Sequence, residues 1–295
     1  MTQSRILYSP RQHKRKQKKL SKEKVRALLV LGGVVLFFIA CIAVVHLSYF
    51  QVREIRVSEA RASETGVGTL VGAAGMEQDA QQLQNTINNL LSGNYAFVVP
   101  KRFIFGIRRQ SLEQQLLAIL SRFETILVTK QYPHALSVSY AKRIFFALLC
   151  NDIAKADIHS CGYIDHTGFV YEDAPDASGS LIIKIRSDLP AVKVGMQAID
   201  AQTVKQMTLF GEGIKRIAGL RLLSYDLSSQ APDELRLHVA DGFTLIVKKA
   251  DNPETVLQIL HTVLTQEIKD RASQLDYLDL RFGNKVFYKF KGGTK

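Results

Sequence analysis

Cys150 and Cys161 are the residues whose type and spacing best suit chemistry. They bracket the ten-residue segment NDIAKADIHS, between two segments that read as strands. An oxidising compartment would allow a disulfide that closes this loop and stabilises the fold by about 2–3 kcal/mol in the entropic description. Free thiols are one alternative. A metal site is another, because His159 and His166 lie near Cys161, although structural zinc sites normally pair cysteines two to four residues apart.

Enzyme motifs with recognisable spacing are absent from the sequence. It contains no G-x-S-x-G, no Walker phosphate loop and no H-E-x-x-H, the patterns that place a nucleophile, a phosphate group or a zinc ion. A hydrolase that uses Cys161 and His166 is the remaining catalytic alternative, since catalytic partners can be distant in sequence. We expect a protein that is not an enzyme, with no catalytic residue, no metal and no cofactor.

An uncharged apolar segment lies near the N-terminus. Residues 27–45, ALLVLGGVVLFFIACIAVV, are nineteen residues without a charge, and a helix of that length spans about 29 Å, close to the thickness of the hydrocarbon core of a bilayer. The apolar run continues past Cys41 and leads into HLSYFQV, which argues against a lipoprotein cysteine and against a cleaved signal peptide. We therefore expect a transmembrane helix within residues 27–47.

Positive charge is concentrated before this segment. Residues 1–26 contain ten Lys or Arg and one Glu, so +9 of the net charge of +12 lies in this tail and +3 in the other 269 residues. The positive-inside rule then predicts a single-pass type II protein, with a cytoplasmic N-terminus and extracytoplasmic C-terminal domains. The tail suits contact with anionic lipid, and the nearly neutral remainder argues against a specific nucleic-acid partner.

Hydrophobic periodicity predicts two domains after the span. The first, residues 48–143, has the order strand, helix, helix, strand, strand, and its second helix begins at the capping-box pattern Ser111-Leu112-Glu113-Gln114. The predicted elements of this domain are strand 50–57, a loop over 58–75, helix 76–91, the helix from Ser111 that carries Phe123, and strands 125–130 and 136–141.

The second domain, residues 144–290, reads as a mostly antiparallel sheet with two helices. Asp241-Gly242 marks a hairpin between strands 235–239 and 243–247, and Gly283-Asn284 marks the last hairpin, 275–282 with 285–290. The other predicted elements are strands 144–150, 162–165, 169–171 and 181–185 and helices 201–217 and 254–268. The expected fold class is α+β, with tails at 1–26 and 291–295.

Three segments in this order match the pattern of one known family. They are Phe50-x-Val52-x-x-Ile55-x-Val57, Pro133-x-x-Leu136-x-Val138, and Leu278-Asp279-Leu280-Arg281-Phe282 followed by Gly283-Asn284-Lys285-Val286. By these segments the chain resembles the bacterial cell-division family called FtsQ or DivIB, which has a POTRA domain followed by a β domain. The family often carries Glu-Arg-x-Pro after the POTRA domain. This chain has Lys142-Arg143-Ile144-Phe145 there and keeps only the arginine.

The resemblance implies a scaffold at the division septum of the cell (inner) membrane, with no catalysis. Members of the family hold single-span proteins of the FtsB and FtsL families and support septal peptidoglycan synthesis. A terminal strand with unpaired N–H and C=O groups could bind such partners by strand addition. The alternative function is that of a membrane-anchored envelope sensor or enzyme with an unrecognised site.

Three residues match the family's partner-binding positions: Phe282, Asn284 and Tyr288. Each also has a purely structural interpretation, as a core residue, a turn residue and a member of a cross-strand pair, respectively. Asp279 and Arg281 lie two residues apart on the same strand, and we expect them to form an exposed ion pair worth less than about 1 kcal/mol.

Overall fold

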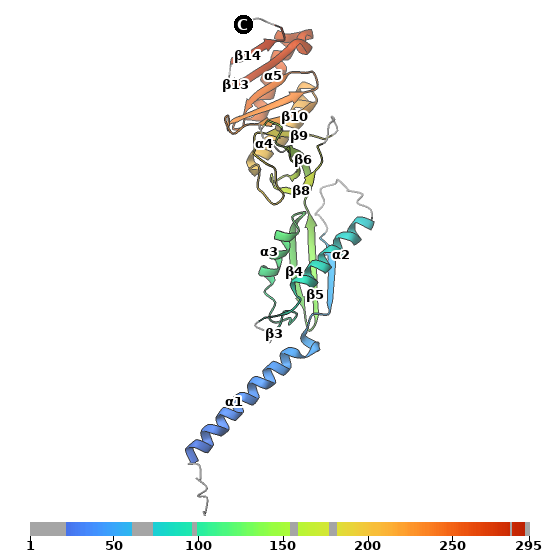
Figure 1. Cartoon of the computed structure of the whole chain (residues 1–295). Helices are drawn as coiled ribbons and strands as arrows, with labels where there is room; N and C mark the ends of the chain where they lie inside the picture. The colour runs from blue at the N-terminus through green and yellow to red at the C-terminus, as the bar shows by residue number, and fades with distance from the viewer. Residues whose placement is uncertain are drawn as a thin grey trace, which may run out of the picture. The chain divides into compact units, whose positions relative to one another are not determined.

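The computed structural model describes residues 22–60, 73–95, 99–153, 159–176, 182–283 and 285–292. These residues group into two compact units. The first takes in the described parts of Met1–Glu54, Leu90–Ile107 and Gln131–Ala135, and the second those of Ile55–Asn89, Arg108–Lys130 and Leu136–Lys295. Figure 1 shows the elements along the chain.

The first unit begins with α1, Lys22–His46. Its Leu29–His46 stretch is long and apolar enough to cross a membrane, and none of it is buried in the protein. The sequence prediction of one such helix is confirmed, and Cys41 lies exposed on it. A 3-10 turn, Ser48–Phe50, follows, and two short strands, β2 (Asn94–Tyr95) and β3 (Val99–Pro100), form a small antiparallel pair.

The second unit contains a three-stranded sheet and two helices in the predicted order. The sheet has the order β1-β5-β4, formed by β1 (Glu54–Glu59), β5 (Ala135–Lys142) and β4 (Phe123–Gln131). The helices are α2, Ala73–Leu90, and α3, Arg109–Ile119. Alternate residues of β5 are buried because the strand has one face in the core, and the rings of Phe123 and Tyr140 meet there at 5.0 Å.

Three local predictions in this region are wrong. Phe123, expected on the helix from Ser111, is the first residue of β4, because α3 ends at Ile119. The first strand begins at Glu54 rather than Phe50, because residues 48–50 form the 3-10 turn after α1. Helix α3 begins after Arg108, so Ser111 lies within the helix and does not cap it. The Glu113 side chain instead accepts a hydrogen bond from the Val128 backbone N–H at 2.7 Å, a contact that the local pattern could not reveal.

The second unit also contains a nine-stranded sheet, which confirms the predicted α+β class and large, mostly antiparallel sheet. Its order is β14-β13-β12-β11-β10-β9-β6-β7-β8. The strands are β6 (Phe145–Cys150), β7 (Cys161–Asp165), β8 (Val170–Ala174), β9 (Lys184–Ser187), β10 (Leu222–Leu227), β11 (Glu234–Val239), β12 (Thr244–Lys248), β13 (Leu275–Phe282) and β14 (Lys285–Phe290).

Three neighbouring pairs in this sheet are parallel: β6 with β9, β9 with β10, and β12 with β13. Two of these arise because α4 (Ala201–Gly213) and α5 (Pro253–Val263) are crossover helices, and parallel strands need such a connection. The sequence analysis did not predict β10. Only one residue of this strand, Tyr225, is fully buried, so its sequence shows no clear alternation.

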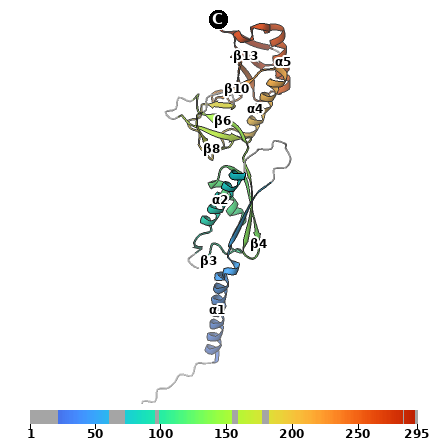
Figure 2. The same cartoon turned by 90° about the vertical axis from the view of Figure 1, so that its right-hand side faces the viewer.

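Both helices lie on the same side of the sheet (Figure 2) and share its apolar core. Each begins at a side-chain cap: Asp200 accepts from Thr203 N–H at 2.8 Å, and Asn252 from Thr255 N–H at 3.2 Å. Gly213 permits the close approach of α5, because a Cβ there would lie 2.3 Å from a methyl carbon of Leu257. The opposite face of the sheet carries the polar side chains described next.

Candidate partner-binding edge of the nine-stranded sheet

Strand β14 is the last strand of the sheet on one side. It pairs antiparallel with β13, from Leu275 opposite Phe290 to Phe282 opposite Lys285. No other strand of the described residues lies beside it. An edge strand of this kind presents backbone N–H and C=O groups to a strand from another chain.

Exposed aromatic side chains gather on this hairpin. Phe282 is 51% exposed, Phe287 52% and Tyr288 41%. Phe282 and Phe287 meet edge to face at 5.2 Å, and Tyr288 meets Phe290 at 5.5 Å. Because successive strand residues point to opposite faces, the two pairs place aromatic rings on both sides of the edge strand.

The structure places the sequence-predicted residues as follows. Phe282 does not share the burial of Leu278 and Leu280, because the pairing of β13 with β14 shifts between Asp279 and Phe282. Tyr288 stands opposite Leu278 in the hairpin, as the cross-strand interpretation expects. Asn284 lies outside the described residues.

Phe287 is an aromatic residue of this edge that the sequence analysis missed. A detectable signal existed, since residues 286–290 read VFYKF and contain three aromatic residues. Only alternate positions of a strand can face the core, so three aromatic residues within five positions of a predicted terminal strand indicate that at least one of them lies on the other face.

The expectation of an exposed ion pair between Asp279 and Arg281 is wrong. Asp279 is buried, and the Arg281 guanidinium donates two hydrogen bonds to its carboxylate, at 2.9 and 2.6 Å. Arg281 also contacts Glu234 of β11. Strands β12 and β14 flank β13 on both sides, so its polar side chains are partly covered by neighbours. Burial raises the pKa of Asp279, but the hydrogen bonds from Arg281 outweigh it and hold that pKa below its ordinary value.

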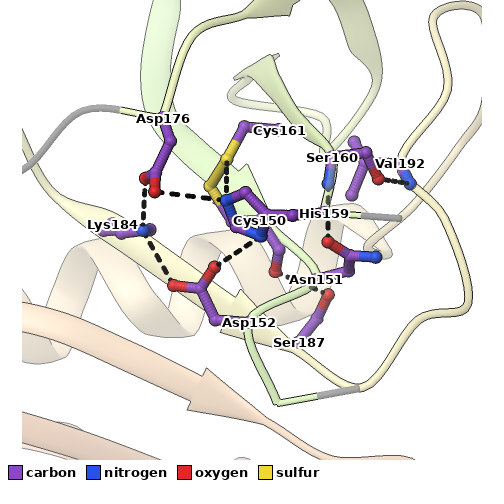
Figure 3. Close-up of a disulfide and its surroundings, with 10 residues drawn as sticks. All are labelled: Cys150, Asn151, Asp152, His159, Ser160, Cys161, Asp176, Lys184, Ser187 and Val192. Carbon is purple, nitrogen blue, oxygen red and sulfur yellow. Dashed lines mark hydrogen bonds and ion pairs between the residues drawn. A yellow bond between two sulfur atoms is a disulfide. The ribbon is translucent and has the colours of Figure 1, made fainter. Parts of the chain in front are cut away.

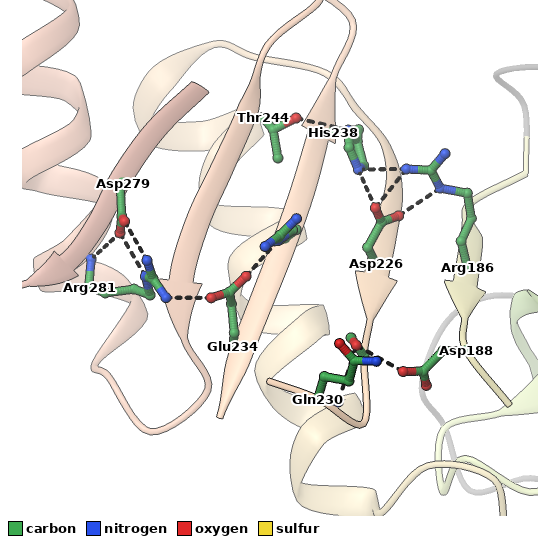
Figure 4. Close-up of polar contacts among 11 residues, drawn as sticks. Arg186, Asp188, Asp226, Gln230, Glu234, His238, Thr244, Asp279 and Arg281 are labelled. Atoms are coloured by element: carbon green, nitrogen blue, oxygen red, sulfur yellow. Dashed lines mark hydrogen bonds and ion pairs between the residues drawn. The ribbon is translucent and has the colours of Figure 1, made fainter. Parts of the chain in front are cut away.

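A second polar group lies on the same face, across β9, β10, β11 and β12 (Figure 4). Arg186 binds the Asp226 carboxylate through two bonds, at 2.6 and 2.7 Å, and His238 Nε2 lies 2.8 Å from the same carboxylate. Thr244 is 3.1 Å from the other ring nitrogen of His238. Burial raises the pKa of Asp226, whereas His238 and Arg186 lower it more, so the net pKa is below its ordinary value.

Arg186 and Asp226 also line a cavity of about 600 Å³, together with Ile153, Ser228, Gln230, Ala231, Glu234 and Arg236. Its charges are paired with one another: Arg186 binds Asp226, and Arg236 binds Glu234 at 2.5 Å. The Ser228 hydroxyl donates to Asp188 at 2.8 Å, so it is not aligned on a histidine base as a nucleophilic serine would be.

Cys150 and Cys161 lie directly opposite each other on β6 and β7 and form a disulfide (Figure 3). His159 Nε2 is 3.6 Å from Cys161 Sγ, and Asp176 is 3.2 Å from the same nitrogen. His166 is not part of this group and packs against Phe146 instead.

The ligand atoms of Cys150, His159, Cys161 and Asp176 lie within 4.8 Å of one another. Both sulfurs are bonded to each other, however, and a metal would need thiolates. The Lys184 ammonium already lies 2.8 Å from carboxylates of Asp152 and Asp176. Burial lowers the pKa of Lys184, but the two carboxylates raise it by more than burial lowers it. The net pKa is therefore above its ordinary value, and the group keeps its charge. The geometry is that of a cross-strand disulfide beside an ion-pair cluster.

No protein-family model matches this chain, and a search of curated proteins finds no match either.

Proposed function

We propose that this protein is a membrane-anchored, non-catalytic scaffold of the FtsQ/DivIB type, which holds FtsB- and FtsL-family proteins at the division septum and supports septal peptidoglycan synthesis. The single observation that carries the proposal is the β14 edge, which combines an open backbone side with exposed aromatic rings. Lys285 and Lys289 are also exposed on β14, so the proposal depends on the exposed rings, which gain by being covered, and not on an absence of charge at this edge.

The proposed topology follows from α1 and the tail before it. The basic residues 1–26 lie in the cytoplasm, α1 crosses the inner membrane once, and the remainder lies outside. Residues 48–143 are proposed to be a POTRA-type domain, which the β-α-α-β-β order supports, and residues 144–290 the family's β domain. A disulfide between Cys150 and Cys161 suits this oxidising side of the membrane.

The proposed mechanism is strand addition to β14. A partner strand extends the sheet through backbone hydrogen bonds, which supply affinity with little sequence selectivity. The aromatic pairs Phe282–Phe287 and Tyr288–Phe290 then contact alternate side chains of the partner strand on its two faces. Aromatic residues are enriched among those that dominate interface energies, because they bury large rigid surfaces.

A binding titration with the full chain in detergent tests this mechanism. Tyr288→Ala is expected to weaken binding to the extracytoplasmic segment of an FtsB-family protein by about 30-fold, equivalent to about 2 kcal/mol. Phe145→Ala is the matched control, since Phe145 is also 41% exposed and meets another ring, Tyr163, at 5.5 Å. Equal affinity of the two variants, or no binding by the unsubstituted chain, would overturn the proposal.

The location of the protein separates the scaffold from the alternative of an envelope sensor or enzyme. A fluorescent fusion to the N-terminal tail is expected to collect at midcell before constriction. Even fluorescence around the envelope throughout the cell cycle would favour the sensor or enzyme.

A further inference from the structure

Five aromatic side chains gather just after the end of α1, in the first unit. They are Tyr49, Phe50, Phe103, Phe105 and Tyr132, and we call them the aromatic cluster. The ring centroids lie 5.1 Å apart for Tyr49–Phe50, 5.7 Å for Phe50–Phe105, 5.5 Å for Phe103–Phe105 and 5.2 Å for Phe105–Tyr132. The cluster thus joins three segments that are distant in sequence.

Backbone hydrogen bonds fix these segments to the end of α1. The Ile104 N–H donates to the Phe50 carbonyl at 3.0 Å, and the Arg53 N–H donates to the His134 carbonyl at 2.9 Å. At the helix end itself, the Gln51 side chain donates to the last helical carbonyl, that of His46, at 3.3 Å. The rings are therefore held at a defined place relative to the helix rather than on a free loop.

Most of this aromatic surface is not used to build a core. Tyr49 and Tyr132 are each 60% exposed and Phe105 is 55% exposed, and Leu47 beside them is 51% exposed. A contiguous exposed apolar surface on an otherwise ordinary domain marks an interaction site. Something covers these rings in the working protein.

The position of the cluster along the helix axis identifies the covering surface. Tyr49 lies in the 3-10 turn, three residues beyond His46, where α1 ends, so the chain can carry it at most about 10 Å from the helix end. The polar interfacial layer of a bilayer is about 5–8 Å thick on each side of the hydrocarbon core. Tyrosine rings are favoured at that depth, because one end is apolar and the other takes hydrogen bonds from water and headgroups.

Positive charge accompanies the rings. Arg53 is exposed next to the cluster, followed by the exposed Glu54, and the ammonium of the partly exposed Lys101 lies 5.9 Å from the ring centre of Tyr95, which is itself 53% exposed. Lipid phosphates attract such cations, at about 1 kcal/mol each near an anionic surface. Aromatic rings with cations beside them suit a lipid headgroup layer better than a second copy of the same cationic surface.

We propose that the aromatic cluster docks into the headgroup layer of the leaflet from which α1 emerges, so that the base of the folded part is a second membrane contact beside the helix. The inference rests on the membrane span in the proposed function and is independent of partner binding at β14. Lipid contact there would restrict the tilt of the first unit relative to the bilayer.

The absence of tryptophan from the sequence allows a direct test. Phe105→Trp introduces a single fluorophore in the cluster, and Phe287→Trp introduces one at a position of similar exposure, 52% against 55%. The full chain carrying either change is reconstituted in vesicles of phosphatidylethanolamine and phosphatidylglycerol, with bromine atoms placed high on the acyl chains. Tyr132→Trp is a second cluster variant, in case Phe105→Trp does not fold.

Both cluster variants are expected to be quenched by the brominated lipid about twofold or more relative to unbrominated lipid, and to be shielded from aqueous iodide. Phe287→Trp is expected to be quenched by aqueous iodide and to be unaffected by the brominated lipid. The proposal would be overturned if the cluster variants were as accessible to iodide, and as insensitive to brominated lipid, as Phe287→Trp. So would shielding that disappears when the protein-to-lipid ratio is lowered, because copies of the chain would then be covering the cluster. Neither result would affect binding at β14, so the two proposals fail separately.

Discussion

The two edge strands of the nine-stranded sheet hold equivalent positions but carry different side chains. β8 ends one side, and its Glu172 and Asp173 are exposed. β14 ends the other side, and it exposes Phe287 and Tyr288 together with Lys285 and Lys289. Charged side chains on an edge discourage strand addition, because an added strand would desolvate them, whereas aromatic side chains gain by being covered.

The β8 edge is also occupied by contacts from the same unit. The Ser121 hydroxyl donates to the backbone carbonyl of Tyr171 at 2.9 Å, and Arg122 lies 3.5 Å from Glu172. The comparison teaches that topology alone does not make a docking site. The sheet has two edges, and we propose β14 as the one that binds a partner because it carries the exposed aromatic rings.

The largest expected effect concerns the disulfide beside β8. Replacing both cysteines, Cys150→Ser with Cys161→Ser, should lower the free energy of unfolding by about 2–3 kcal/mol, because the unfolded chain regains the freedom of the loop. Urea unfolding of the full chain in detergent measures this change, and Cys41→Ser, on the exposed face of α1, is the control. Binding at β14 should stay unchanged. A loss of binding in the double variant would show that the two edges are not independent.

The next effect concerns the ion pairs that support β13. Arg281→Gln leaves Asp279 buried without its guanidinium, which should cost about 2 kcal/mol, less than for a fully buried pair because Arg281 is partly exposed. Urea unfolding at neutral pH measures this loss. Lys289→Gln is the comparison, since its pair with Asp276 is 3.5 Å long and both side chains are largely exposed. Equal losses in the two variants would contradict the buried character of the Asp279 site.

The same pair gives a pH dependence. The pKa of Asp279 is held below its ordinary value of 3.8, with burial acting against the Arg281 hydrogen bonds. Its contribution to stability is therefore fully present above about pH 4 and is lost as the pH falls through the folded-state pKa. In Arg281→Gln the difference in unfolding free energy between neutral pH and pH 3 should shrink. An unchanged difference would assign the acid sensitivity to other carboxylates, such as Asp226 and Asp165.

The smallest effect concerns the aromatic residue that the sequence analysis missed. Phe287→Ala should weaken binding of the FtsB-family segment about tenfold, which corresponds to about 1.4 kcal/mol. Stability should change little, because Phe287 is about half exposed and contacts mainly Phe282. The thermal midpoint of the variant is the control measurement. An unchanged affinity would confine docking to the Tyr288 side of the strand.

Local patterns predicted individual elements well where one face of an element is buried. The predicted strand 235–239 is β11, and the predicted helix 254–268 begins within one residue of the start of α5. The patterns failed at Ser111, where a capping-box sequence occurs inside a helix, because the helix start is set by neighbours distant in sequence. They also missed β10, which lies between two strands and shows little alternation.

At Cys150 and Cys161, too, the sequence supplied part of the answer and the tertiary structure supplied the rest. Sequence spacing allowed a disulfide between Cys150 and Cys161 but left free thiols and a metal site open. The antiparallel register of β6 and β7 places the two residues opposite each other, with Cα atoms 4.2 Å apart. His166, which spacing made a possible ligand, points elsewhere, because its turn lies at the other end of β7.

The sequence by itself determined the apolar helix near the N-terminus, the concentration of positive charge before it, and most of the helices and strands, with β2, β3 and β10 as the exceptions, because these features depend on residues close together along the chain. Tertiary structure alone decided the strand order, the three parallel pairings and the identity of the edge strands. It also brought Tyr49, Phe105 and Tyr132 together from separate segments. Such neighbours are selected by long-range packing and hydrogen bonding, which periodicity along the chain does not encode.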